Sequence, residues 1–170
     1  FSKGGTFNKW YGNSQNILSL IDMWDDTKTN KSVRRGDREF YYRRGIGWSQ
    51  MGGGVNKAFS EIVNSVCKTT TPMFYVNNAE EYNYILGFLN SKIPPRILKA
   101  LNPTLSILTS DIVNLPFLFD KKYVKDINFL VEECIAISKK HYSEKEENWQ
   151  FTESCLIINQ NSIYDSYRLW

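Results

Sequence analysis

The stretch Leu101–Phe117, LNPTLSILTSDIVNLPF, joins two segments whose patterns are typical of helices. Asn102 and Pro103 end the first segment, because the residue before a proline disfavours the helical conformation. A short apolar run follows, and Asp-Ile-Val-Asn-Leu-Pro then leads directly into the second segment. We expect this joint, residues 101–117, to set the angle between two parts of the molecule.

Capping signals predict where the surrounding helices begin. Asn78 with Glu81 forms a capping-box pattern that opens a helix before the joint. Pro94-Pro95 suits the first turn of a second, shorter helix. After the joint, Asp120 can cap a longer helix, and Ser143 with Glu146 predicts a further helix start. The longer helix carries an apolar stripe formed by Tyr123, Ile127, Leu130, Val131, Cys134, Ile135 and Ile137.

The first 76 residues have the pattern of strands and loops. We expect strands within Thr6–Asn13, Asn16–Trp24 and Arg38–Ser49, and two more on either side of Pro72. The fold class is therefore α+β, with a strand-rich N-terminal region followed by a helical part with a longer spacer helix. We expect one domain at 1–117 and a helical extension at 118–170 that the end of the chain cuts short.

Composition excludes several classes of site. No apolar run approaches the roughly 20 residues that span a bilayer, so no membrane contact is expected. The three widely spaced cysteines are expected to be reduced thiols of a cytoplasmic protein. Cys67, Cys134 and Cys155 form no Cys-x-x-Cys pair, and His141 has no ligand-type neighbours. Three consecutive glycines, Gly52–Gly54, lack the Lys-Ser/Thr of a phosphate loop. No residues can be assigned to a free-standing enzyme.

Charge is distributed unevenly along the chain. Residues 1–125 contain 17 Lys and Arg against 10 Asp and Glu, whereas residues 126–170 contain 4 against 8. Between Lys28 and Lys57, 8 basic side chains face 2 acidic ones. Such a cluster is either an electrostatic footprint for nucleic-acid phosphates or an ordinary solvated loop, and composition alone does not separate the two.

Four stretches, of which the joint is the last, together resemble a known family. They are Lys3–Asn13, Arg43–Ser49, Ile85–Lys92 and Leu101–Phe117, and their order and spacing are similar to the target recognition region of BREX adenine-specific DNA methyltransferases of the PglX type. The joint also resembles the end of recognition domains in type I restriction specificity subunits and fused restriction-modification enzymes. The resemblance covers most of the chain and implies a bacterial phage-defence protein.

The family implies a division of labour. The chain lacks the Asn-Pro-Pro-Tyr motif that holds the target adenine and a Gly-rich loop for S-adenosylmethionine. The resemblance therefore implies a non-catalytic recognition domain that binds double-stranded DNA, without a cofactor in this fragment. Its partner is the catalytic domain of the parent chain, an S-adenosylmethionine-dependent methyltransferase. In this interpretation the joint holds the recognition unit at an angle to the spacer helix.

Basic and amide side chains are the candidates for DNA contact. Arg43 and Arg44 are the strongest candidates for DNA contact, because adjacent arginines beside a glycine turn rarely both find buried partners. Trp10 and Trp48 are expected to pack in the core. The predicted DNA-binding residues are Lys9, Lys28, Lys31, Arg34, Arg35, Arg38, Arg43, Arg44, Gln50 and Lys57.

Two alternatives stay open at this stage. One is half of a type I restriction specificity subunit, which also recognises DNA. The other is a protein-interaction module that docks a partner through the helix at 120–142. Binding to DNA that falls with salt favours recognition, and tight association with a protein without DNA binding favours the module.

Overall fold

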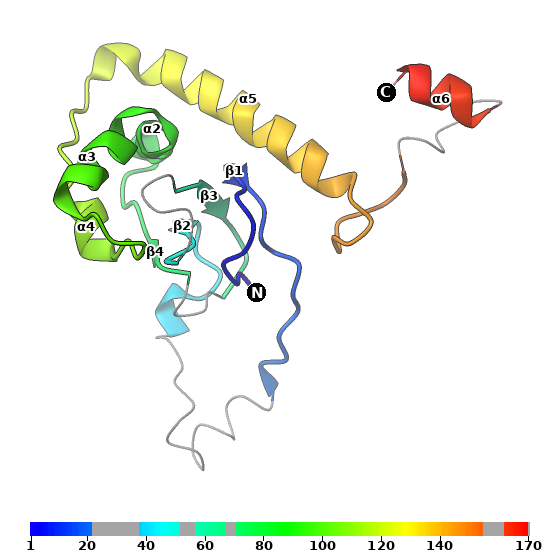
Figure 1. The fold of residues 1–170 in the computed structure, drawn as a ribbon, viewed down its shortest axis with the longest axis horizontal. Helices are drawn as coiled ribbons and strands as arrows, with labels where there is room; N and C mark the ends of the chain where they lie inside the picture. Colours follow the sequence, from blue (N-terminus) through cyan, green and yellow to red (C-terminus); the bar gives the residue numbers. More distant parts are fainter. Residues whose placement is uncertain (22–37, 52–56, 67–70, 155–161, 170) are drawn as a thin grey trace.

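The computed structural model describes residues 1–21, 38–51, 57–66, 71–154 and 162–169. Its sheet has four short strands, β1 (Trp10–Tyr11), β2 (Gly45–Trp48), β3 (Phe59–Ile62) and β4 (Met73–Phe74), in the order β1-β3-β2-β4. β1 pairs with β3 in parallel, and the other two pairs are antiparallel. The mixed sheet precedes most of the helices (Figure 1), which confirms the α+β class.

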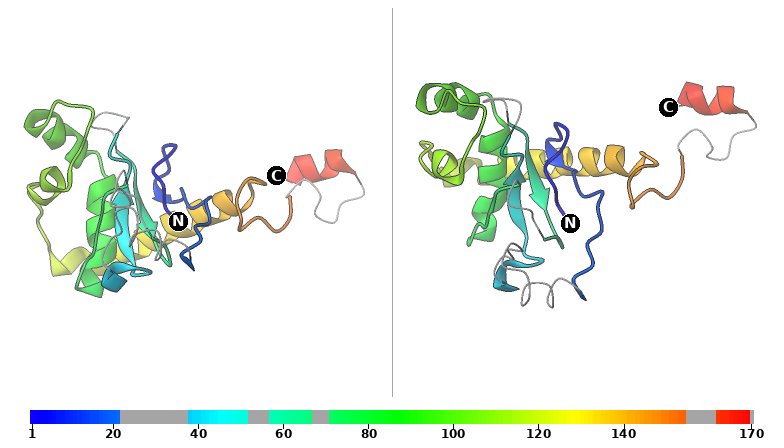
Figure 2. Two further views of the ribbon diagram at one scale, coloured as in Figure 1. Left: turned by 90° about the horizontal axis from the view of Figure 1, so that it is seen from below. Right: turned by 60° about the horizontal axis from the view of Figure 1, so that its bottom comes forward.

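The helical part begins directly after β4. In the described residues it consists of α2 (Ala79–Asn90), α3 (Ile93–Leu101), α4 (Thr109–Val113), the short 3-10 turn η2 (Lys121–Tyr123), α5 (Val124–Ser143) and α6 (Ile163–Leu169). Another 3-10 turn, η1 (Arg38–Phe40), precedes β2. α5 is the longest element and crosses the molecule beside α2 and the sheet, whereas α6 stands apart from both (Figures 1 and 2).

The core lies where the helices cover the sheet. Trp48 and Phe59 from neighbouring strands pack with Leu86 of α2 and with Val131 and Ile135 of α5 in one cluster. Trp48 is 2% exposed, which confirms its predicted core role, and Trp10 packs against the same cluster while half-buried. The division at residue 117 stays a prediction, and the structure adds that α5 shares this core.

The capping signals of α2 and of the helix after Asp120 are confirmed. The Asn78 side chain accepts a hydrogen bond from the Glu80 amide, and its own amide donates to Glu81. Asp120 accepts from the Lys122 amide where η2 begins and leads into α5. At the end of α2, the buried Asn90 side chain bonds both the amide and the carbonyl of Phe59. This pair of bonds satisfies backbone groups of β3 that the sheet leaves open.

The joint links two helices and also packs into the core. Asn102 ends α3 and donates to Asp111, whose carboxylate also accepts from the Leu108 amide at the start of α4. Ile107 is fully buried, and its carbonyl accepts the Trp48 indole N–H at 3.0 Å. The joint is therefore attached to β2, an inner strand of the sheet.

Two expectations about local structure are wrong, and two helices were missed. Asn16–Leu20 form no strand, and residues 22–24 lie outside the described part of the chain. The helix predicted to start at Ser143 is absent from the described residues 144–150, because α5 itself continues to Ser143 and the hydroxyl bonds back to the Lys140 carbonyl. The helices α4 and α6 were not expected.

The strand predicted within Arg38–Ser49 is shorter than expected. It begins only at Gly45, because η1 and a turn precede it. Tyr42 in that turn has a φ of 64°, a left-handed conformation that bulky residues rarely adopt. The segment before β2 is thus a shaped loop rather than an extended strand.

Candidate nucleic-acid interface

Arg43 lies on a platform of aromatic rings at the start of β2. The rings of Phe40 and Tyr75 stack with centroids 5.1 Å apart, and the Tyr75 hydroxyl donates to the Phe40 carbonyl at 3.0 Å. The Arg43 guanidinium carbon lies 5.0 Å from the Tyr75 centroid and 5.5 Å from the Phe40 centroid. We call these three residues the arginine platform. Contacts between a guanidinium and aromatic rings favour one orientation of its donor fork.

The platform faces solvent. Arg43 is exposed, and among the described residues no carboxylate pairs with it. Tyr42, 54% exposed, precedes it, and Arg38 is exposed on the neighbouring turn η1. Two cations and several accessible rings therefore occupy one end of the sheet. This combination suits phosphate and base contacts in nucleic acids.

Arg44 has a different environment. Its guanidinium bonds Glu61 of β3 with a shortest distance of 2.6 Å and lies 3.8 Å from the Tyr82 centroid. Lys139 of α5 bonds the other Glu61 oxygen at 2.9 Å. The Glu61 side chain is 4% exposed, whereas Arg44 and Lys139 keep 47% and 45% of theirs. We call Arg44, Glu61 and Lys139 the Glu61 clamp, because they tie the sheet to α5.

The clamp distinguishes the two adjacent arginines. They were not expected both to find buried partners, and in the described part of the chain only Arg44 pairs with a buried carboxylate, that of Glu61. Burial and the nearby Glu61 carboxylate raise the pKa of Tyr82, whose hydroxyl donates to the Gly45 carbonyl. Arg44 thus has a structural role, while a direct role in DNA contact stays a prediction.

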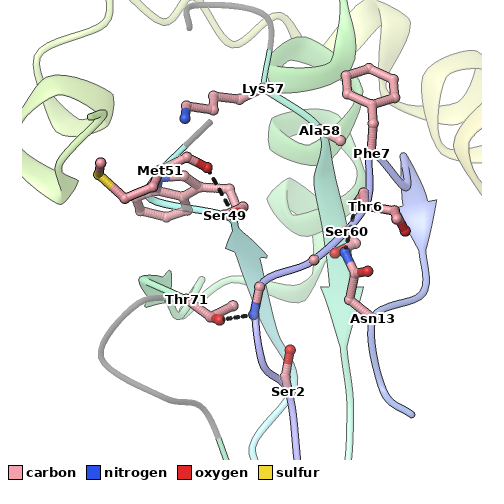
Figure 3. A pocket seen from close by; sticks show the side chains of 13 residues that line it. Ser2, Thr6, Phe7, Asn13, Ser49, Met51, Lys57, Ala58, Ser60 and Thr71 are labelled. Atoms are coloured by element: carbon pink, nitrogen blue, oxygen red, sulfur yellow. Dashed lines mark hydrogen bonds between the residues drawn. The ribbon is translucent and has the colours of Figure 1, made fainter. Parts of the chain in front are cut away.

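Lys57 lines a hollow of about 130 Å³ beside the sheet, together with Ser49 and Met51 (Figure 3). Lys57 is 5% exposed and donates to the carbonyls of Gln50 and Leu105, at 2.9 and 3.3 Å. Burial lowers the pKa of Lys57. The Gln50 carbonyl also accepts from the Ile107 amide. Gln50 and Lys57 therefore connect the strand ends to the joint.

The other predicted residues separate into two groups. Lys9 is half-buried and donates to the Asn90 carbonyl at 3.0 Å, at the end of α2. Four more lie outside the described residues, namely Lys28, Lys31, Arg34 and Arg35. Of the predicted set, the structure brings Arg38, Arg43 and Arg44 together at one end of β2, and Gln50 and Lys57 at the other end.

Sequence reasoning missed the aromatic half of the platform. Tyr75 comes from the segment between β4 and α2, 32 positions after Arg43, and no local pattern links the two. The aromatic run Phe40–Tyr42 was the only sequence signal for the platform.

In the described residues no group of three or more His, Cys, Asp or Glu could hold a metal ion. The helices described there are also too short or too polar to cross a membrane.

Comparison with known proteins confirms the resemblance drawn from the sequence. The chain is 25% identical over 177 residues to an adenine-specific methyltransferase PglX of Lacticaseibacillus casei (strain Zhang), covering 100% of this chain. It is 26% identical over 168 residues to an adenine-specific methyltransferase BrxX of Escherichia coli O9:H4 (strain HS), covering 98% of this chain. The chain spans 14% of the length of each relative. No family model matches it.

Proposed function

We propose that the chain is the target recognition region of a BREX-type adenine-specific DNA methyltransferase. The observation that carries the proposal is the arginine platform, exposed within a segment that aligns along its whole length with two adenine-specific methyltransferases. Double-stranded DNA is then the ligand, and the catalytic domain of the parent chain is the neighbour. Such an enzyme acts on DNA in the bacterial cytoplasm during phage defence.

Arg43 is the residue best suited to DNA contact. Its planar guanidinium rests against Phe40 and Tyr75, so its N–H groups can donate at the edge of the plane. A bidentate contact with O6 and N7 of guanine would read sequence in the major groove. A contact with a phosphate would instead fix the register of the protein on the duplex. Tyr42 precedes Arg43 in the sequence and adds aromatic surface. Arg38 lies on η1 and adds positive charge.

Catalysis belongs to the rest of the parent enzyme in this proposal. S-adenosylmethionine is the methyl donor that the family resemblance implies, and a doubly wound fold would bind it at a glycine-rich strand-to-helix turn. In the described residues, the strand followed directly by a helix is β4, and its link to α2, Tyr75–Asn78, has no glycine. This link supports placing the cofactor in the rest of the parent enzyme, and we derive no step through it.

A separate recognition region suits the chemistry of adenine methylation. The target base must leave the duplex before its amino group can react, which requires a few kcal/mol of unstacking and unpairing. A domain that holds the duplex beside the flipped base supplies binding free energy for that step. The arginine platform contributes both charge and stacking surface to this grip.

Methylome mapping of the full-length parent enzyme tests the proposal and requires no assumption about the target sequence. Arg43→Ala should lower adenine methylation at the normal motif, or relax the motif at one base pair. Arg168→Ala removes an exposed arginine from α6 and serves as the matched control. An unchanged motif and unchanged extent of methylation in Arg43→Ala, with normal protein levels, would contradict the assignment.

Calorimetry separates recognition from catalysis. The chain of 170 residues, titrated with S-adenosylmethionine, should give no heat of binding, because the described strand-to-helix link lacks the required glycines. The full-length enzyme is the positive control. A one-site isotherm for the chain alone would place the cofactor site within it and overturn the non-catalytic part of the proposal.

A further inference from the structure

An apolar groove of about 570 Å³ lies between α2, α3 and α5, away from the arginine platform. Ser91 is its only residue with an aliphatic hydroxyl, and no charged side chain lines it in the described part of the chain. Gly87 of α2 lets α5 come close, since a Cβ there would meet Val131 at 3.0 Å. The groove is thus built on a tight helix crossing.

The rim of the groove is apolar and exposed. Leu118 is 84% exposed, Leu130 is 57% exposed and Ile93 is 55% exposed. Together they come from the segment after the joint, from α5 and from α3. Contiguous apolar surface around a hollow marks an interaction site more often than isolated exposed residues do.

One edge of α5 has the spacing of a coiled-coil seam. Tyr123, Leu130 and Ile137 are seven positions apart and are 47%, 57% and 69% exposed. Ile127 and Cys134 fall between them, are half-buried and line the groove, which completes a repeat of three and four residues. Such a repeat accepts the apolar seam of another helix.

Charges border the groove with opposite sign on its two sides. On α5, Asp126 and Glu133 are exposed immediately before the groove-lining Ile127 and Cys134, and Lys140 ends the same row. On α3, the exposed Lys92 and Arg96 immediately precede the groove-lining Ile93 and Ile97. A helix that fills the groove would therefore carry basic residues along its α5 side and acidic residues along its α3 side.

We propose that the groove receives an amphipathic helix from the remainder of the parent methyltransferase, which couples the recognition region to the catalytic part. The inference rests on the proposed function. The relatives extend far beyond the segment that this chain matches, 14% of their length, so a large part of the protein is available to supply the helix.

A second copy of the chain fits the groove less well. In that copy α5 already buries Val131 and Ile135 in its own core, so it offers only its edge. The α5 helix of that copy also forms one side of an identical groove. Two concave surfaces of this kind are not complementary in shape. A helix whose whole apolar face is available can contact the groove-lining residues of α3 and of α5 at the same time.

Site-specific photo-cross-linking in the full-length parent enzyme tests this occupant. The photoreactive p-benzoyl-phenylalanine replaces Leu118 or Leu130, which are exposed enough for the enzyme to keep its fold. The control replaces Ala136, which is also exposed on α5 but does not line the groove. Irradiation, digestion and mass spectrometry then identify the attached peptide.

The proposal predicts cross-links from 118 and 130 to one helix of the same polypeptide outside residues 1–170, with at least five-fold less product from 136. Adducts of doubled mass would identify a second copy, and links within residues 1–170 would identify a local segment; either result overturns the proposal. So does the absence of cross-links, or equal cross-linking from 136. DNA binding by the same variants reports separately on the proposed function.

Discussion

Arg43 and Arg44 are neighbours in sequence, yet they belong to regions with different physical roles. Arg43 lies against two rings of the arginine platform and faces solvent. Arg44 belongs to the Glu61 clamp, where it bonds a carboxylate that is 4% exposed. Arg43 follows the turn at Tyr42 and Arg44 directly precedes β2, so adjacent identical residues reach different surroundings. Residue type and local charge therefore do not define a binding site by themselves.

Glu61→Ala should have the largest effect on stability, because it removes the anionic centre of the clamp. Breaking a fully buried ion pair costs about 3–5 kcal/mol. Here Arg44 and Lys139 are about half exposed and can be hydrated, so we expect a loss of about 2 kcal/mol in the free energy of unfolding. Urea unfolding measures it.

The matched control for this variant is Glu132→Ala on α5. Its exposed carboxylate accepts a hydrogen bond from Asn83, which also contacts Arg44. We expect a change of about 0.5 kcal/mol or less, as for most exposed substitutions. Equal stabilities for Glu61→Ala and Glu132→Ala would show that the clamp does not hold the sheet to α5.

Arg44→Ala should have an intermediate effect. It removes one ion pair and the contact with the Tyr82 ring but leaves Lys139 bonded to Glu61. We expect a loss of about 1 kcal/mol, in the range of a single partly exposed pair together with a cation–π contact. Thermal unfolding should show that Arg44→Lys recovers part of this loss. A variant as stable as the parent would contradict the structural role of Arg44.

Tyr82 should make stability depend on alkaline pH. Its pKa is raised in the folded protein, so it stays neutral there while the unfolded chain ionises above about pH 10. The folded state then binds more protons, and the free energy of unfolding falls as the pH rises above 10. The part due to Tyr82 is on the order of 1 kcal/mol near pH 10.5–11.

Urea unfolding at pH 8 and pH 10.7 checks the prediction in the parent protein and in Tyr82→Phe. The variant should lose less stability between the two pH values, although it lacks the hydroxyl that bonds the Gly45 carbonyl. Burial lowers the pKa of Lys57, which acts in the opposite direction below its ordinary pKa of 10.5 and is common to both proteins. Identical pH dependence in the two proteins would refute the role of Tyr82.

Local signals predicted the parts of the fold that local forces determine. The Asn78 cap, the end of α3 at Asn102 and the Asp120 cap are all present, because each is satisfied by groups within a few residues. The Ser143 pattern failed although it has the same chemistry, since Tyr142 is buried against Tyr11 and keeps α5 helical to that point. Tertiary packing overrode the capping preference there.

The candidate site was only partly predictable for the same reason. The excess of basic residues before Lys57 pointed to the region of the sequence that contains the arginine platform, and Arg43 was named within it. The pairing of Arg44 with Glu61 joins positions 17 apart, and the stacking of Phe40 with Tyr75 joins positions 35 apart. Contacts over such separations depend on strand order and register, which composition and periodicity do not encode.

The DNA affinity of Arg43→Ala and Arg44→Ala in the full-length enzyme tests the roles of the two arginines most directly. Fluorescence anisotropy across a salt series measures the affinity, and unfolding is measured on the same samples. Arg43→Ala should bind more weakly, with a salt slope about one unit shallower for a phosphate contact, or lose about 1–3 kcal/mol for one guanine. Its stability should stay within about 0.5 kcal/mol of the parent. Arg44→Ala should be less stable, and any loss of DNA affinity once it is folded should be smaller than that of Arg43→Ala. Weakened binding in Arg44→Ala with unchanged binding in Arg43→Ala would contradict the assignment of the two arginines.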